Sequence, residues 1–171
     1  MPISEKIFLT NSKYSKDYRS KKLGERNKIT LRSALAEDLA NITNEIRKMQ
    51  LDSTLINYHQ FIIAELNGEF AGFGRIKEYN DAKELCSLGV LPKYRGKGIS
   101  RILIKELKTK AVIKPLHVVT IIPTLFKKFG FEEIIKYPAS LLPKINYCTN
   151  TLGGCHNGEH YVVMKRMRKI I

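Results

Sequence analysis

The chain has 171 residues, of which 43% are hydrophobic and 27% are charged. These values are ordinary for a globular protein and favour a single domain with a sizeable core. No run approaches the roughly 20 apolar residues of a membrane-spanning helix, and the polar N-terminus does not resemble a secretory signal. Three cysteines without framework spacing favour a reducing, cytoplasmic location.

The formal net charge of +14 leaves several interpretations open. Such a charge attracts polyanions non-specifically, suits a site for a phosphate-rich cofactor, or reflects only a solvated basic surface. Because the basic residues are scattered without interleaved aromatic residues, we expect no dedicated nucleic-acid binding.

The first part of the chain predicts an extension followed by a strand and a helix. Residues 1–27 are polar and basic without periodicity. We interpret them as an N-terminal extension, partly ordered at best, that can fold back or contribute to a homodimer. Residues 28–171 are expected to form one domain, beginning with a strand over 28–33 and then an amphipathic helix. Its first turn holds Glu37 and Asp38, and one face of it carries Leu39, Ile42, Ile46 and Met49. The stretch 51–60 is ambiguous, with a short second helix as one option.

A β-hairpin and a central strand are expected next. Residues 61–66 and 69–79 are predicted to be antiparallel strands, because Asn67-Gly68 between them is a strong type I′ turn signal. After a turn at residues 80–82, the mostly apolar run 83–91 is typical of a strand that is covered on both faces.

The glycine-bearing turn after this strand is a candidate anion site. Pro92 ends the strand, and apolar residues at helical spacing indicate a helix that starts near Gly98. The segment from Arg95 to Ser100 therefore offers backbone N–H groups at a helix N-terminus, two of them on glycines. The helix dipole and the missing side chains both favour a phosphate at this position.

A parallel strand and a short helix follow. Residues 116–121 are a β-branched run, and because a helix precedes them we expect them to lie parallel to the strand 83–91. A short helix over 124–129 is predicted, begun by Pro123 and capped by Gly130.

The end of the chain predicts a strand over 131–137, a loop over 138–158 and a closing strand over 160–166. The expected fold is a mixed α/β (α+β) domain. Its central sheet has about six to seven mostly antiparallel strands, with helices on both faces.

The turn carries a family resemblance, in the run Val90-Leu91-Pro92-Lys93-Tyr94-Arg95-Gly96-Lys97-Gly98-Ile99-Ser100. It resembles the pyrophosphate-binding motif Arg/Gln-x-x-Gly-x-Gly/Ala of the GNAT superfamily of acyl-CoA N-acyltransferases, usually introduced by Val-x-Pro-x-x-Arg-Gly. Ser100 departs from the usual Gly or Ala but is small. The resemblance implies acetyl-CoA as cosubstrate, and a plain structural turn is the alternative. The cofactor-binding residues that we expect are Leu88, Val90, Arg95, Gly96, Lys97, Gly98, Ile99, Ser100 and Phe126.

A second run, Leu125-Phe126-Lys127-Lys128-Phe129-Gly130-Phe131, resembles a later GNAT motif, Leu-Tyr-x-Lys-x-Gly-Phe. The family's Tyr often serves as general acid toward the departing CoA thiolate, whereas Phe126 has no proton to give, so we assign no acid. This region is also similar to the acetyltransferase domain of N-acetylglutamate synthases, whose central strand carries a Glu where Glu84 stands. That resemblance implies an amino acid such as glutamate as acceptor.

Amide formation from a thioester needs a base, a stabilised oxyanion and two reactants held together. Glu84 is the candidate base because desolvation raises the pKa of a carboxylate among apolar residues, and it can act through a water. The alternative is a structural pair with Lys83 or Arg75. Backbone N–H groups near Leu88 to Val90 would stabilise the oxyanion if a bulge or splay leaves them unpaired.

Regular strand alternation would place Cys86 on one face with Glu84, Leu88 and Val90. Cys86 is either an acyl-accepting nucleophile or a small buried hydrophobe, and we favour the second interpretation.

Further polar groups have open roles. Arg75 and Lys77 either bind the carboxylates of an acceptor such as glutamate or lie on a solvated strand. Zinc-ligand types occur near the C-terminus, but their spacing is not a recognised pattern, so we expect no metal. These residues are Cys148, Cys155, His156 and His160.

We therefore expect an acetyl-CoA-dependent N-acetyltransferase in which a small amine attacks acetyl-CoA directly in a ternary complex. One alternative is the same chemistry on a protein N-terminus or lysine. Another is a regulatory module that binds CoA without turnover, which the absence of an acid at Phe126 favours.

Overall fold

The computed structural model describes residues 16–19, 28–111, 113–149 and 160–167. Its strands form one eight-stranded mixed sheet in the order β1-β2-β3-β4-β5-β6-β8-β7, in which β5 and β6 are parallel and the other neighbours antiparallel. The strands are β1 (Lys16–Arg19), β2 (Lys28–Ser33), β3 (Phe61–Leu66), β4 (Glu69–Glu78), β5 (Lys83–Val90), β6 (Leu116–Thr120), β7 (Phe131–Glu133) and β8 (Val162–Arg166). The α-helices are α1 (Leu39–Lys48), α2 (Ile99–Thr109), α3 (Pro123–Lys127) and α4 (Leu142–Thr149). The 3-10 turns are η1 (Ala36–Asp38), η2 (Tyr58–Gln60), η3 (Pro92–Tyr94) and η4 (Ala139–Leu141).

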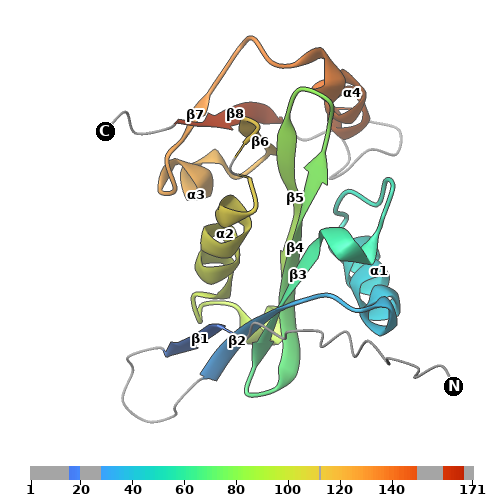
Figure 1. The fold of residues 1–171 in the computed structure, drawn as a ribbon, viewed down its shortest axis with the longest axis vertical. Coiled ribbons are helices and arrows are strands. Elements are labelled where there is room, and N and C mark those ends of the chain that lie inside the picture. The colour runs from blue at the N-terminus through green and yellow to red at the C-terminus, as the bar shows by residue number, and fades with distance from the viewer. Residues whose placement is uncertain (1–15, 20–27, 112, 150–159, 168–171) are drawn as a thin grey trace, which may run out of the picture.

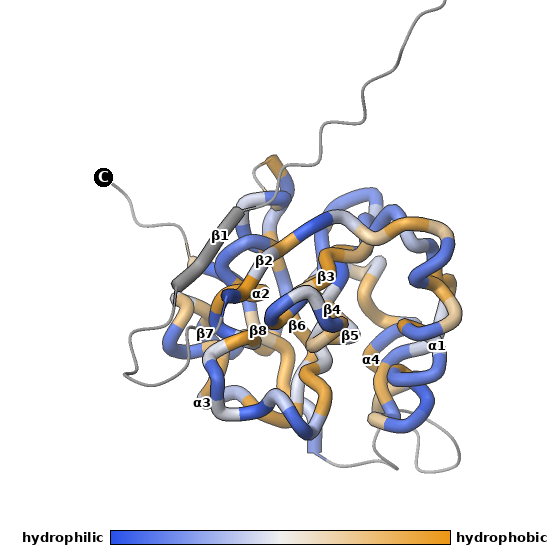
Figure 2. The backbone as a smooth tube through the Cα atoms, turned by 90° about the horizontal axis from the view of Figure 1, so that it is seen from below, coloured by the Kyte–Doolittle hydropathy of each residue, from blue (hydrophilic) through white to orange (hydrophobic). Residues whose placement is uncertain are grey.

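Helices cover both faces of the sheet. Figure 1 shows α1 and α2 on opposite sides of the strands, and Figure 2 places α4 on the side of α1 and α3 on the side of α2. The buried apolar residues that the structure describes form three clusters, the first around α2 and the second between α1 and Phe61, Ile63 and Phe73. The third contains Val119, Cys148 and Val163. The predicted mixed, mostly antiparallel sheet with helices on both faces is confirmed.

The hairpin between β3 and β4 turns at the predicted dipeptide. Asn67 and Gly68 both have positive φ values, 53° and 85°, and Leu66 pairs with Glu69 across the turn. A type I′ turn requires positive φ at both central positions, so the prediction from this dipeptide is confirmed.

Strand β5 is irregular where the site lies. Phe73 pairs with Gly89 and Arg75 with Cys86, so two residues of β5, Ser87 and Leu88, lie opposite one residue of β4. Ser87 has φ +48°, and this local conformation makes a β-bulge. Within the described residues, β6 pairs with β5 only at its start, through Lys83↔Leu116 and Glu84↔His117. Beyond that point β5 and β6 separate. This is the kind of splay that would leave backbone N–H groups of β5 unpaired.

Two segments differ from the sequence prediction. The loop expected over 138–158 contains η4 and helix α4, and residues 150–159 lie outside the described part. Helix α4 contains Pro143 in its first turn, a position where proline is compatible with a helix. The possible helix over 51–60 amounts to the single turn η2.

Part of the predicted N-terminal extension belongs to the sheet. Strand β1 pairs antiparallel with β2 at the sheet edge, with Lys16 opposite Leu31 and Arg19 opposite Lys28. The remainder of residues 1–27 lies outside the described part. Among the helices that are described, none has the length and apolar character required to traverse a bilayer.

Candidate functional site

The turn between β5 and α2 has the geometry of an anion site. Gly96 and Gly98 have φ values of +76° and +82°, which only glycine adopts without strain, and Gly98 is the N-cap of α2. Their positions are exposed, and the Arg95 side chain donates from Nε to the carbonyl oxygen of Val90 at 3.2 Å. The α2 N-terminus thus presents backbone N–H groups to solvent beside the end of β5.

A cavity of about 430 Å³ begins at this turn and extends along the bulged part of β5. Its wall includes Ser87–Val90 of β5, Val118–Thr120 of β6 and Phe126 of α3, so it occupies the splay between the two parallel strands. All of the predicted cofactor-binding residues except Lys97 line this cavity. The structure therefore brings together the turn, the bulge and Phe126, which are distant in sequence.

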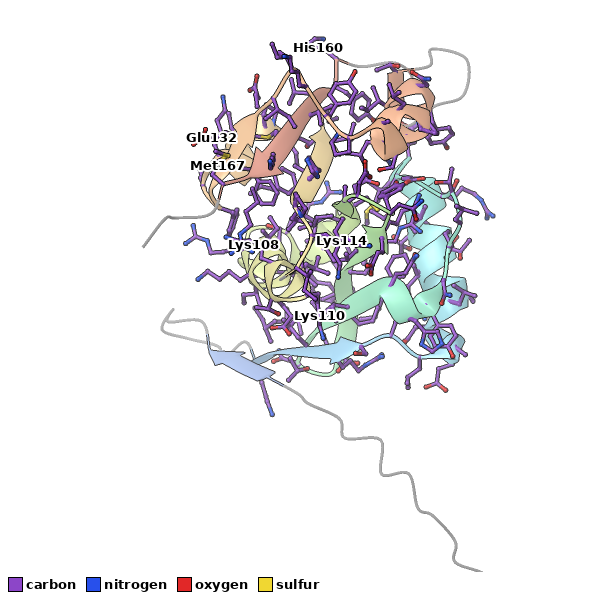
Figure 3. The ribbon with its side chains drawn as sticks, turned by 45° about the horizontal axis from the view of Figure 1, so that its top comes forward. Lys108, Lys110, Lys114, Glu132, His160 and Met167 are labelled. Atoms are coloured by element: carbon purple, nitrogen blue, oxygen red, sulfur yellow. The ribbon has the colours of Figure 1, made fainter. Side chains whose placement is uncertain are left out.

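A second, basic groove adjoins the first cavity and shares the turn with it. Lys108 and Met167 both line this groove, and Figure 3 shows them on the same side of the molecule. Burial lowers the pKa of Lys108, and the nearby charges of Arg166 and Lys105 lower it further. The groove's cations are Arg101, Lys105, Lys108, Lys128 and Arg166, and none of the described residues that line it is acidic. It is suited to a phosphate-bearing group that continues outward from the turn.

At its other end, the first cavity reaches a buried ionic cluster centred on Asp52. Oδ2 of Asp52 lies 2.8 Å from Nζ of Lys144, 3.3 Å from Nζ of Lys77 and 3.4 Å from Nη2 of Arg75. Burial alone would raise the pKa of Asp52, but Lys144 and hydrogen bonds from Thr54 hold that pKa well below its usual value. Asp52 is therefore ionised. Its ion pairs connect the loop after α1 with β4 and α4.

Arg75 has a structural role in this cluster. Its guanidinium donates to the carbonyl oxygens of Asp52, Thr54 and Leu55, at 3.0, 3.0 and 3.3 Å. It also donates to the Ser87 hydroxyl at 3.0 Å, which in turn donates to the carbonyl of Asp52 at 2.8 Å. Fully buried and occupied in this way, Arg75 is not free to bind an acceptor, and the idea that it lies on a solvated strand is wrong.

Glu84 is completely buried, but its partners differ from those considered from sequence. Oε2 accepts a hydrogen bond from the Tyr79 hydroxyl at 2.8 Å, and Oε1 lies 3.7 Å from Nζ of Lys144. Oε1 is buried and has no hydrogen-bond partner among the described residues. Burial raises the pKa of Glu84, opposed in part by Lys144 and Tyr79. Glu84 does not itself line the cavity.

The predicted shared face of β5 is wrong beyond the bulge. Cys86 lies with Glu84 and Asp52, within 4.8 Å of their ligand atoms, whereas Leu88 and Val90 pack with the apolar cluster around α2. The extra residue in the bulge shifts the alternation by one position, so the side chains after it point to the other face. Burial raises the pKa of the Cys86 thiol to about 12, which agrees with a buried hydrophobe and not with a nucleophile.

Phe126 is buried in the cavity wall, with its ring edge-on to Phe131 at a centroid distance of 5.6 Å. It packs where the family resemblance would place a tyrosine acid.

Of the zinc-ligand types, Cys148 is buried in the cavity wall. His160 is exposed just before β8, and Figure 3 shows it at the edge of the molecule. Cys155 and His156 lie outside the described residues.

The sequence reasoning missed Asp52 and Lys144 as site residues. Both line the cavity, yet they come from a loop and from the unpredicted helix α4. Asp52 had no motif around it, and Lys144 was one of 30 basic residues. A nearly buried lysine is rare unless it is paired, but its burial is visible only in the fold.

Comparison with known proteins finds a family match for the central part of the chain. The model of the acetyltransferase (GNAT) domain matches residues 57–133, a stretch that contains the bulged strand, the glycine turn and Phe126. This stretch of the chain is therefore similar to a GNAT acetyltransferase domain. Asp52 and Lys144 lie outside the matched stretch.

Individual relatives agree with this assignment. An uncharacterised N-acetyltransferase from Chlorobaculum tepidum is 30% identical over 95 residues, which are 52% of this chain and 60% of that protein. N-acetylglutamate synthase from Neisseria gonorrhoeae, complexed with coenzyme A and N-acetyl-glutamate, superposes with a TM-score of 0.66 at 20% identity. That alignment covers 81% of this chain and 34% of the synthase. Rv2747 from Mycobacterium tuberculosis, in complex with CoA and NLQ, gives a TM-score of 0.63 at 19% identity over 81% of this chain and 98% of its own. The two solved structures show a shared fold.

Proposed function

We propose that the protein is an acetyl-CoA-dependent N-acetyltransferase that acetylates a small amine, with amino acids such as glutamate as candidate acceptors. The observation that carries this proposal is the continuous cavity from the glycine turn, along the bulged edge of β5, to the Asp52 cluster. It offers positions for a diphosphate, an extended thioester arm and an acceptor in one line. Titration of the full chain with CoA tests the binding half of this proposal.

CoA would bind through backbone and basic groups. Its diphosphate would accept hydrogen bonds from the N–H groups at the α2 N-terminus, and the cations of the adjoining groove suit its 3′-phosphate. The pantetheine arm would lie along the edge of β5 that β6 leaves unpaired. The acetyl group would then stand beside the bulge at Ser87–Leu88, with its carbonyl oxygen near backbone N–H groups of Leu88 to Val90.

In the proposed reaction the acceptor amine attacks the thioester carbon directly. The N–C bond forms, the C–S bond breaks, and the CoA thiolate departs with its electron pair. The amine proton passes to Glu84, and because burial raises the pKa of Glu84, its carboxylate is a stronger base than an exposed one. Because Glu84 stands behind the cavity wall, we propose that an intervening water carries the proton. No residue is assigned as acid for the thiolate.

A thiol-release assay with acetyl-CoA across amino acids, polyamines and peptides tests this function. We expect CoA release with at least one free amino acid and less with peptides. Release with peptides alone would favour a protein acetyltransferase. Binding of CoA without any release would favour the regulatory module, for which the absence of an acid at Phe126 is the specific argument.

Location and assembly are further parts of the proposal. Cys86 is a buried, free thiol, which agrees with a reducing cytoplasm. A homodimer remains a prediction that sedimentation of the full chain would test.

A further inference from the structure

Among the described residues, the buried cluster at the inner end of the cavity contains more positive than negative charge. Its cations there are Arg75, Lys77 and Lys144, and its acids are Asp52 and Glu84. Even with both of these carboxylates ionised, one positive charge of the described set is left over. Other titratable side chains near the cluster, among the described residues, include Tyr79, Cys86, Cys148 and Tyr161. Burial and the charge of Glu84 raise the pKa values of Tyr79 and Cys86, so these two supply no anion at neutral pH. An uncompensated buried charge is costly, so the cluster is suited to receive a further anion.

The excess charge is accessible at one residue. Arg75 is occupied by backbone carbonyls and by Ser87, and Lys77 contacts Asp52 and the Thr54 hydroxyl at 2.8 Å. Neither lines the cavity, whereas Lys144 does. The Lys144 ammonium carries three N–H donors. Among the described carboxylates, Asp52 is within hydrogen-bonding distance of it, and Glu84 at 3.7 Å is beyond that range.

The surroundings strengthen a charge contact at this position. The neighbouring wall is formed by Met49, Leu51 and Cys148, with the Tyr161 ring, and these side chains are mainly apolar. A charge pair in such surroundings is screened less than one on the surface. Lys144 is 7% exposed, so an ion must enter through the cavity to reach it.

We propose that Lys144 binds a carboxylate of the acceptor, so that the acceptor class is a free amino acid and not a simple amine or a peptide N-terminus. This inference rests on the proposed function for the identity of the acceptor. The carboxylate completes the charge balance of the cluster, and its contact with Lys144 holds the acceptor at the inner end of the cavity. The amine of the same molecule then points back toward the bulge of β5.

Binding measurements on the full chain saturated with CoA test the proposal without turnover. The probes are L-alanine, L-glutamate and L-phenylalanine, each paired with its α-amide, and the readout is the calorimetric Kd. We expect at least one acid to bind on the order of tenfold or more tightly than its amide, as a charge-assisted contact provides. Lys144→Met should abolish this ratio while leaving amide binding unchanged, and Lys144→Arg should retain part of it.

Lys136→Met is the matched control, since this exposed lysine precedes α4 and lines neither cavity. Wild-type protein that binds acids and amides equally would overturn the proposal, even if Lys144→Met fails to fold. So would a Lys144→Met variant that folds and keeps the acid preference, or weakens acid and amide alike. Absence of CoA binding would instead contradict the proposed function, and acid preference without thiol release would contradict that function while supporting the subsite.

Discussion

The two ends of the cavity are built in different ways. The glycine turn is local, because two positive-φ glycines and a helix N-terminus within six consecutive residues make the site from main-chain atoms. The Asp52 cluster is assembled from four separate segments and depends on side chains that are almost completely buried. The first end is therefore independent of most of the fold, whereas the second exists only when β4, β5, α4 and the loop after α1 are in place.

The largest effect should come from Glu84, which serves the chemistry at the long-range end. Glu84→Gln removes the proposed base at nearly constant volume, and we expect kcat to fall by roughly 10²–10⁴-fold. CoA affinity should not change, because the turn does not involve Glu84. Steady-state thiol release with calorimetric CoA titration measures both, and an unchanged kcat would rule out the base.

The same residue predicts a pH dependence of defined sign. Burial raises the pKa of Glu84, and a base must be ionised, so kcat should rise with pH through this pKa and the Gln variant should lose that limb. The contribution of Glu84 to the free energy of unfolding changes with pH in the opposite direction. A carboxyl whose folded pKa is raised adds stability below its unfolded value, and this stability is lost as pH rises through the folded pKa. Urea unfolding of the wild type and of Glu84→Gln at several pH values measures this difference in stability.

Asp52 tests whether the cluster supports the whole fold. Asp52→Asn leaves Arg75, Lys77 and Lys144 without their shared anion, and breaking a buried pair costs about 3–5 kcal/mol. Glu69→Gln is the control, because the ion pair between Glu69 and Lys93 is exposed. Urea denaturation should show a large loss for Asp52→Asn and almost none for the control. If Asp52→Asn and Glu69→Gln were equally stable, the Asp52 cluster would not support the fold as described.

Ser87 connects the cluster to the bulge. Ser87→Ala removes the hydroxyl between Arg75 and the Asp52 carbonyl, and leaving such groups unsatisfied costs about 1–3 kcal/mol. We expect lower stability and a lower kcat with little change in the KM for acetyl-CoA, because the bulge positions the thioester carbonyl. Ser87→Gly relieves the backbone at φ +48° and should recover part of the stability but not the missing hydrogen bonds.

The smallest effect on folding should be at the turn. Gly98→Ala places a Cβ at φ +82°, which strains the backbone by roughly 1–2 kcal/mol. If the turn shifts to relieve this strain, the Kd for CoA should rise about tenfold. Gly68→Ala is the matched control, since φ there is +85° and neither position has an atom within 4 Å of the added Cβ. The two variants should be destabilised alike, and only Gly98→Ala should weaken CoA binding. Equal affinity in both would remove the turn from the site.

The sequence supported prediction where a few adjacent residues decide the structure. Asn67-Gly68 predicted the hairpin, and Pro92 with the glycines predicted where β5 ends and α2 begins. A bulge or splay in this strand was expected because the oxyanion needs unpaired backbone N–H groups. Its position at Ser87 could not be predicted, because no residue type there specifies a bulge.

The acceptor end could not be predicted, since no motif surrounds Asp52 and the sequence does not show that Lys144 is buried. Burial, and not residue type, distinguishes Lys144 from the other lysines. Burial depends on helix α4 packing on the same side of the sheet as α1 (Figure 2), a tertiary arrangement that local patterns do not encode.

A crystal structure of the full chain with CoA tests the central claim most directly. We predict the diphosphate on the N–H groups of Gly96 to Ser100, with the pantetheine arm in the cavity and its sulfur beside the bulge at Ser87–Leu88. A bound CoA whose diphosphate lies away from this turn, or whose sulfur points away from β5, would contradict the account.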